Sequence, residues 1–134
     1  MTIGIEPQIF AVTGITGQVG GVVARTLLAA GKPVRAVVRS AEKGDIWAKQ
    51  GCEVALADMT QANALTAAFS GAQAVFVLLP PVFAPAPGFP ESKSVVAALK
   101  TALTAAQPDR IVALSTIGAQ ATRDNLLTQL QMME

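Results

Sequence analysis

Residues 9–31 read IFAVTGITGQVGGVVARTLLAAG. The stretch opens with a short apolar run, residues 9–13, which is typical of a buried strand and stops at Gly14. Apolar residues then recur at helical spacing, at Val19, Val22, Val23 and Leu27. Gly31 can end that helix in a left-handed conformation, and Pro33 prevents its continuation. The stretch therefore predicts a strand, a glycine-rich loop and a helix.

The rest of the chain repeats this alternation. Further strands are predicted over residues 34–38, 53–57, 74–79 and 110–115. Helices are predicted over residues 42–50, 61–69, 92–106 and 125–134, with a proline-rich loop over 80–90 and with Thr60 as the N-cap of the helix that follows it. Because crossovers between parallel strands are right-handed, the pattern predicts an α/β fold with a doubly wound parallel sheet of about five strands and helices on both faces. The chain is predicted to be one domain.

Composition excludes several classes of protein. Hydrophobic residues make up 51% of the chain and charged residues only 14%, which is typical of a packed core rather than a disordered chain. A net charge of +1 argues against nucleic acid as a partner. With one cysteine, Cys52, and no histidine, neither an internal disulfide nor a usual zinc site can form, so no metal is expected. Cys52 is predicted to be an inert thiol.

No segment is typical of export or of a membrane. The first basic residue is Arg25, so no charged region precedes an apolar signal segment. The longest apolar run, residues 74–79, is far shorter than the roughly 20 residues that a spanning helix needs. We expect a cytoplasmic protein without membrane contact.

The glycines at positions 14, 17 and 20 have the spacing G-x-x-G-x-x-G between the first strand and the first helix. A pyrophosphate needs backbone N–H donors and close approach, which side chains would obstruct. Gly14 is predicted to make the tight turn, Gly17 the close contact and Gly20 the packing of helix on strand, with Thr16 as a further cofactor contact. The alternative is a turn with helix-packing glycines that bind nothing.

The second strand ends on a basic residue, Arg39, where enzymes that use the unphosphorylated dinucleotide carry a carboxylate for the ribose hydroxyls. A guanidinium can bind a 2′-phosphate through two N–H groups, and Lys43 adds a second positive charge. Arg35 lies four strand residues earlier, toward the opposite end of the sheet. We therefore predict NADP as the cofactor in preference to NAD; the alternative is that Arg39 is a solvated surface residue.

The third strand ends on Asp58 and Met59. The Asp58 carboxylate is predicted to lie near the adenine amine, with Met59 against the adenine face. The alternative, equally supported by the sequence, is that Asp58 caps the turn into the next helix.

These motifs together resemble the NmrA-like branch of the atypical short-chain dehydrogenase/reductase family. The resemblance rests on TGITGQVG (13–20), VRAVVRS (34–40), the long segment ADMTQANALTAAFSGAQAVFVLLPP (57–81) and VALSTIGAQ (112–120). It implies a Rossmann-type NAD(P)-binding domain over residues 1–134. It also implies cofactor contacts, which would be Gly14, Gly17, Gln18 and Val19 at the pyrophosphate, Arg39 and Lys43 at the 2′-phosphate, Asp58 and Met59 at the adenine, and Leu79 and Pro80 at the ribose.

Catalytic residues cannot be assigned. Many members of the wider family use a Tyr-x-x-x-Lys pair, but this chain has no tyrosine and no lysine after Lys100. Ser115, at the end of the fifth strand, is therefore predicted to be a hydrogen-bonding residue beside the cofactor rather than a catalyst.

The resemblance implies an oxidoreductase that passes hydride from NADPH to a quinone-like small molecule. Two alternatives stay open: a regulatory module that senses NAD(P) without catalysis, and a truncated product that retains only cofactor binding. Family members are usually about twice as long, so the C-terminal substrate-binding portion is expected to be missing. An unpaired fifth strand would then favour self-association through the C-terminal edge.

Overall fold

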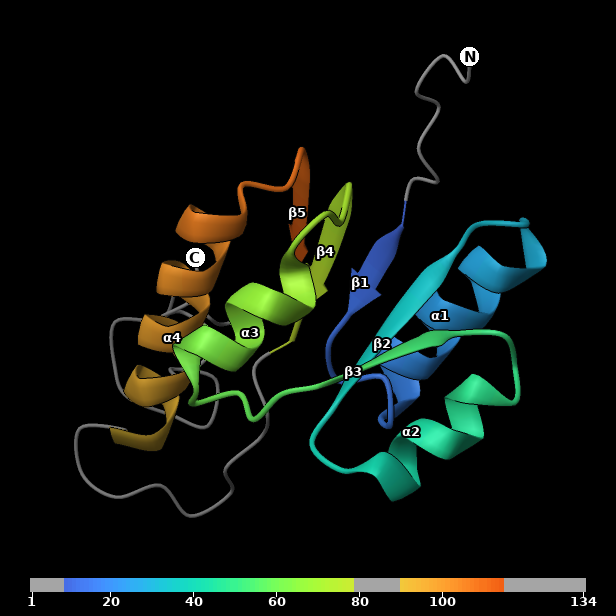
Figure 1. Ribbon diagram of the computed structural model, residues 1–134, viewed down its shortest axis with the longest axis horizontal. Coiled ribbons are helices and arrows are strands. Elements are labelled where there is room, and N and C mark those ends of the chain that lie inside the picture. Colours follow the sequence, from blue (N-terminus) through green and yellow to red (C-terminus); the bar gives the residue numbers. More distant parts are fainter. Residues whose placement is uncertain (1–8, 79–89, 115–134) are drawn as a thin grey trace.

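The computed structural model describes residues 9–78 and 90–114, with nine helices and strands that alternate along this part of the chain (Figure 1). The strands are β1 (Phe10–Val12), β2 (Val34–Val38), β3 (Glu53–Leu56), β4 (Ala74–Val77) and β5 (Arg110–Ala113). The helices are α1 (Gln18–Ala29), α2 (Ala41–Ala48), α3 (Ala62–Phe69) and α4 (Pro90–Ala106).

All five strands are parallel and form one sheet in the order β3-β2-β1-β4-β5. Phe10 of β1 lies opposite Val34 on one side and Ala74 on the other, so β1 is central. The predicted doubly wound α/β fold is therefore confirmed. Strand order reverses between β1 and β4, and in such sheets the ligand crevice lies beyond the carboxyl ends of the strands at this point.

The sheet has a separate core on each face, and Figure 1 shows it between the α3/α4 pair and the α1/α2 pair. On the α3/α4 face, the fully buried Leu65 and Phe69 pack with Val75 and the inner side of α4. On the α1/α2 face, Val12, Ala24 and Trp47 belong to the second core. The side chains of β2 alternate between these cores, which explains why its sequence is apolar almost throughout.

Most predicted elements are confirmed within one or two residues, and their ends have local causes. Gly31 has a φ of +76° and ends α1 as predicted: its N–H donates to the Leu28 carbonyl at 3.0 Å, and the Lys32 N–H donates to the Leu27 carbonyl at 2.9 Å. The prediction of Thr60 as an N-cap was wrong. Gln61 holds that position without a side-chain cap, because the Thr60 hydroxyl donates to Asp58 instead.

The apolar runs predicted as the fourth and fifth strands are longer than the strands in the structure. β4 ends at Val77 and β5 at Ala113. Leu79, Pro80 and Ser115 lie outside the described residues, as do most of the predicted proline-rich loop and the whole predicted helix 125–134. Within residues 9–78 and 90–114, no helix is long and apolar enough to cross a membrane.

Thr13, directly after β1, connects β1 to the end of β4. It is fully buried; its hydroxyl donates to the Phe76 carbonyl at 3.0 Å and accepts from the Leu78 N–H at 3.0 Å. Its own N–H also donates to the Phe76 carbonyl. These three bonds hold the start of the glycine loop beside Leu78.

We expect Thr13→Val to lower the free energy of unfolding by about 1–3 kcal/mol, because it leaves the Leu78 N–H without its hydrogen-bond partner beside a fully buried side chain. Urea titration followed by circular dichroism measures the loss. Thr66→Val is the matched control: the Thr66 hydroxyl only donates to the Ala62 carbonyl one turn earlier in α3. Equal effects of the two substitutions would show that Thr13 does not have this role.

Candidate functional site

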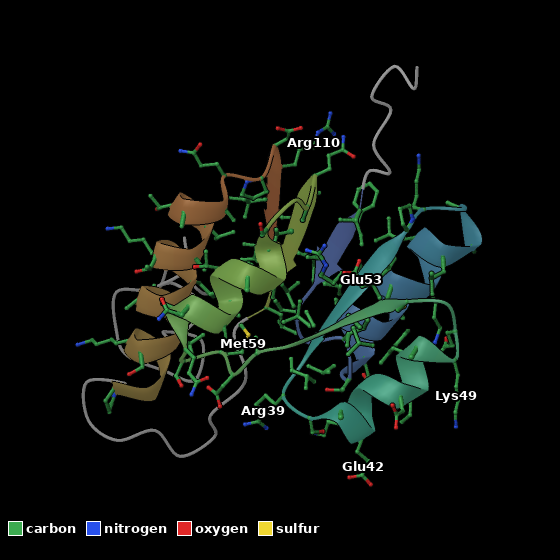
Figure 2. The ribbon with its side chains drawn as sticks, in the orientation of Figure 1. Arg39, Glu42, Lys49, Glu53, Met59 and Arg110 are labelled. Carbon is green, nitrogen blue, oxygen red and sulfur yellow. The ribbon has the colours of Figure 1, made fainter. Side chains whose placement is uncertain are left out.

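A cavity of about 730 Å³ lies at the carboxyl end of the sheet. It is bounded by the glycine loop, the ends of β2 and β3, Leu78 after β4 and the first turns of α4. Its lining residues are Gly14, Ile15, Thr16, Gly17, Val37, Val38, Arg39, Lys43, Ala57, Asp58, Met59, Thr60, Leu78, Pro90, Ser94 and Val95. Figure 2 shows Arg39 and Met59 at this end of the sheet and Arg110 at the opposite end. The cavity thus occupies the place that the topology predicts.

The glycine loop has little room for side chains. Gly14 has a φ of +63°, which residues other than glycine rarely adopt, and a Cβ there would lie 2.6 Å from the Leu78 Cδ2. A Cβ on Gly20 would lie 2.2 Å from the Gly14 carbonyl oxygen. Gly20 therefore allows α1 to pack closely against the backbone of the glycine loop. The prediction that it allows α1 to pack against β1 was wrong in this respect.

Gly17 differs from these two glycines. A Cβ there would meet only the Gly14 carbonyl oxygen, at an ordinary contact distance of 3.4 Å, and its backbone is extended, with φ −88° and ψ 175°. Nothing in the described protein therefore requires glycine at this position. Because Gly17 is exposed and lines the cavity, its missing side chain leaves room for a ligand to approach the backbone.

The start of α1 supplies hydrogen-bond donors beside this loop. The first α-helical bond runs from the Gly21 N–H to the Gly17 carbonyl at 2.9 Å, so the N–H groups of Gln18, Val19 and Gly20 precede the ladder and have no partner within the helix. Gly17, as N-cap, has no side chain to accept from them, and the first turn contains no acidic residue. The positive end of the helix dipole favours an anion here. Gln18 and Val19 are exposed and do not line the cavity.

The other end of the cavity is basic. Arg39 follows β2 directly, is exposed and lines the cavity together with Lys43. The Ser40 side chain caps α2 by accepting from the Lys43 N–H at 3.3 Å, which fixes the first turn of α2 beside Arg39. Two cations and a helix N-terminus thus lie at the same corner of the site.

Asp58 caps its own turn, as the second of the two interpretations predicted. Its Oδ1 accepts from the Thr60 N–H at 2.8 Å and from the Thr60 hydroxyl at 2.6 Å. These hydrogen bonds, with the nearby positive charge of Arg39, hold the pKa of the Asp58 carboxyl below its usual range. The carboxylate is therefore ionised at neutral pH and also lines the cavity beside Met59. Its contact with an adenine remains a prediction.

Arg35 lies at the opposite end of β2, as expected. Its Nη1 donates to the Ala68 and Ser70 carbonyls, both at 2.7 Å, and its Nε lies 3.4 Å from Glu53. Arg35 therefore connects β2 to the end of α3 and takes no part in the cavity.

Cys52 and Trp47 are structural residues. Cys52 is buried, and burial raises the pKa of its thiol, which keeps it protonated and unreactive. Trp47 packs in the α1/α2 core, with the Arg25 guanidinium 5.3 Å from the centre of its ring. Within the described parts of the chain, no group of three or more metal-ligating side chains occurs.

Sequence reasoning missed Pro90, Ser94 and Val95, which bring the first turns of α4 to the cavity. No local motif marks them, because their place depends on how α4 packs against α3. Thr13 was also missed, although a polar residue directly after a buried apolar strand was a usable signal.

The sequence of this chain is similar to the sequences of known NAD(P)H-binding proteins. A sequence profile of the NAD(P)H-binding family matches residues 14–134. An NAD(P)H azoreductase from Xenophilus azovorans is 35% identical over 108 residues, which cover 81% of this chain and 35% of the azoreductase.

Solved structures of two reductases have a similar fold over most of this chain. A triphenylmethane reductase from Citrobacter sp., complexed with NADP(H), superposes with a TM-score of 0.73 at 27% identity over 92% of this chain and 43% of its own. An NADPH-dependent quinone oxidoreductase from Escherichia coli, complexed with NADPH, gives 0.76 at 25% identity over 92% and 42%. The chain thus spans less than half the length of each of these relatives. By its match over residues 14–134, it belongs to the NAD(P)H-binding family.

Proposed function

We propose that residues 1–134 form the cofactor-binding portion of an NADPH-dependent reductase of the NmrA-like group. One observation carries the proposal: a single cavity joins a glycine loop at a helix N-terminus to a basic corner formed by Arg39 and Lys43. NADPH has two anionic groups, a pyrophosphate and a 2′-phosphate, at its middle and at its adenosine end. The two features of the cavity match these two groups in kind, and they lie at the ends of two neighbouring strands, β1 and β2.

The residues present fit this cofactor. The N–H groups at the start of α1 would bind the pyrophosphate, with Gly14, Thr16, Gly17, Gln18 and Val19 around it. Arg39 and Lys43 would bind the 2′-phosphate, and Asp58 and Met59 would contact the adenine. Leu79, Pro80 and Ser115 remain predicted contacts at the ribose and nicotinamide end. Two of the similar structures contain NADP(H) or NADPH, which supports NADP over NAD.

The proposed reaction is hydride transfer to a small, electron-poor acceptor such as a quinone. When bound, NADPH supplies the hydride, which is two electrons and one proton. A quinone that accepts it becomes a hydroquinone anion, and water can protonate that anion. The chain has no tyrosine to act as a proton donor, and this acceptor class needs none. The relatives reduce azo compounds, triphenylmethane dyes or quinones according to their names.

Substrate binding is assigned to residues outside 1–134, because the relatives are more than twice as long as the matched region.

The remaining parts of the proposal follow from the sequence. They are a cytoplasmic location, and self-association through β5, which lies at one edge of the described sheet. Sedimentation at tens of micromolar tests the second: a monodisperse monomer would contradict it.

Titration calorimetry with NADPH and NADH tests cofactor binding directly. We expect saturable binding of both, with NADPH at least about tenfold tighter, which corresponds to about 1.4 kcal/mol. No heat of binding from a folded sample, or equal dissociation constants, would contradict the proposal.

The cavity also fits a second function, an NAD(P)-sensing module without catalysis, because its glycine loop and its basic corner are both suited to binding the cofactor. Oxidation of NADPH, followed by its absorbance with a panel of small quinones, separates the two. Turnover of any member of the panel would support the reductase and contradict the sensor.

A further inference from the structure

Gly44 is a buried glycine at the end of the first turn of α2. It does not have the positive φ of Gly14 or Gly31, so a residue with a side chain could adopt its backbone conformation. Glycine within a helix also makes that helix less stable than alanine would. Neither the backbone conformation nor helix propensity therefore explains why glycine occupies this position.

The packing around Gly44 does explain it. A Cβ at this position would lie 2.6 Å from the Val54 Cγ1 and 3.3 Å from the Val38 Cγ2. Val54 belongs to β3, Val38 ends β2, and both pack in the α1/α2 core. Because β-branched side chains have few χ1 rotamers, they cannot easily turn away from a new methyl group. The missing side chain thus lets the start of α2 lie directly on β2 and β3.

Two buried residues, Gly44 and Trp47, hold α2 on the sheet. Trp47 fills the α1/α2 core one turn further along the helix, so Gly44 sets the distance of the first turn from the sheet. That turn is the part of α2 that reaches the cofactor cavity. Lys43, directly before Gly44, lines the cavity, and Ser40 caps the helix beside it. The contact at Gly44 therefore fixes one side of the basic corner.

We infer that Gly44 is a positioning residue for the selection of NADPH, an inference that rests on the proposed function. Its close contact with Val54 holds Lys43 where Lys43 and Arg39 can bind one 2′-phosphate together. An added Cβ would have to move by about 1 Å to reach an ordinary carbon–carbon distance from the Val54 Cγ1. Since Trp47 is fixed in the core, the first turn would tilt away from the sheet.

A tilt of this size matters for one nucleotide and not for the other. Lys43 would move with α2, whereas Arg39, directly after β2, would stay at the end of its strand. Binding groups have to be held within about 0.5 Å of their productive positions, so the two cations would no longer fit one phosphate. NADH has no 2′-phosphate, and its affinity should not change. The effect therefore appears in the NADPH-to-NADH ratio of dissociation constants, which a general loss of stability does not alter.

Calorimetric titration of Gly44→Ala with NADPH and NADH tests the inference. We expect the preference for NADPH to fall at least about fivefold, with the NADH dissociation constant within about twofold of that of the unaltered protein. Val54→Ala in the Gly44→Ala background removes the γ-methyl groups that the new Cβ meets at 2.6 and 3.5 Å, and it should restore the preference. Val54→Ala alone is the matched control and should keep the preference of the unaltered protein.

If Gly44→Ala does not fold, as judged by circular dichroism, Val54→Ile takes its place. It keeps the glycine and extends the β3 side chain toward α2 by one methyl group, so it should reduce the preference in the same way.

Three results would overturn the inference. They are an unchanged preference in the folded variant, equal weakening of both nucleotides, and a loss that Val54→Ala does not restore. The first two would show that Gly44 serves the fold alone, and the third that the loss does not come from this contact. Failure of the proposed function is distinguishable, because the unaltered protein would then bind neither nucleotide or both equally, and the inference would fall with it.

Discussion

Gly20→Ala is expected to destabilise the protein by about 3 kcal/mol or more, although alanine normally favours a helix over glycine by about 1 kcal/mol. The reason is the 2.2 Å between the added Cβ and the Gly14 carbonyl oxygen. That atom belongs to the backbone of a loop held by Thr13, so no side-chain rotation can relieve the contact. Urea unfolding measures the loss, and NADPH binding should disappear with the loop geometry.

Gly21→Ala is the control in the same helix. A Cβ there would lie 3.3 Å from the Arg25 Nη1 and from the Ile15 carbonyl oxygen, which is tight but partly relieved by a flexible side chain. Its effect should stay within about 1 kcal/mol. If Gly20→Ala were as mild as Gly21→Ala, the close approach of α1 to the loop would be wrong.

Gly17→Ala separates the fold from the proposed function. The backbone at Gly17 suits alanine, and its Cβ would meet the protein only at 3.4 Å, so the free energy of unfolding should change by less than about 1 kcal/mol. The same methyl group would project where the pyrophosphate approaches the backbone. We expect at least about tenfold weaker NADPH binding by calorimetry. Unchanged affinity would mean that Gly17 does not contact the cofactor.

The order of elements was predictable from the sequence because parallel strands buried on both faces are apolar throughout, as in Val34–Val38, and because glycines with positive φ end helices, as at Gly31. Strand ends were less predictable. Apolar character continues past Val77 and Ala113, whereas the observed strands stop there. The capping of α3 was mispredicted because Asp58 and Thr60 can each bond to the backbone, and only the structure shows that they bond to each other.

For the site, seven of the residues predicted from the sequence as cofactor contacts line one cavity, because residues after parallel strands meet at one edge of the sheet. These are Gly14, Thr16, Gly17, Arg39, Lys43, Asp58 and Met59. The sequence could not show that Gly20 packs on the Gly14 carbonyl, since the path of the loop is not encoded in glycine spacing. The sequence also could not predict that Val95 lines the cavity, since the place of Val95 depends on the packing of α4 against α3.

Arg39→Ala is expected to weaken NADPH binding by about 10- to 150-fold and to leave NADH binding unchanged. Charge-assisted hydrogen bonds of this kind contribute about 1.5–3 kcal/mol, and only NADPH has the 2′-phosphate that would accept them. Arg39→Asp should reverse the preference, because a carboxylate at the end of β2 can accept from the ribose hydroxyls of NADH and repels the 2′-phosphate. Calorimetric titration of each variant with both nucleotides measures the ratio of dissociation constants.

Arg35→Ala is the matched control, because Arg35 is a basic residue within β2, the strand that Arg39 follows, and has a different role. Its guanidinium bonds to the Ala68 and Ser70 carbonyls at the other end of the sheet, so its loss should lower stability and leave the NADPH-to-NADH ratio unchanged. A general loss of positive charge would instead weaken NADPH binding in both variants alike. Such a result would mean that attraction to the whole domain, rather than the corner formed by Arg39 and Lys43, selects the phosphorylated cofactor.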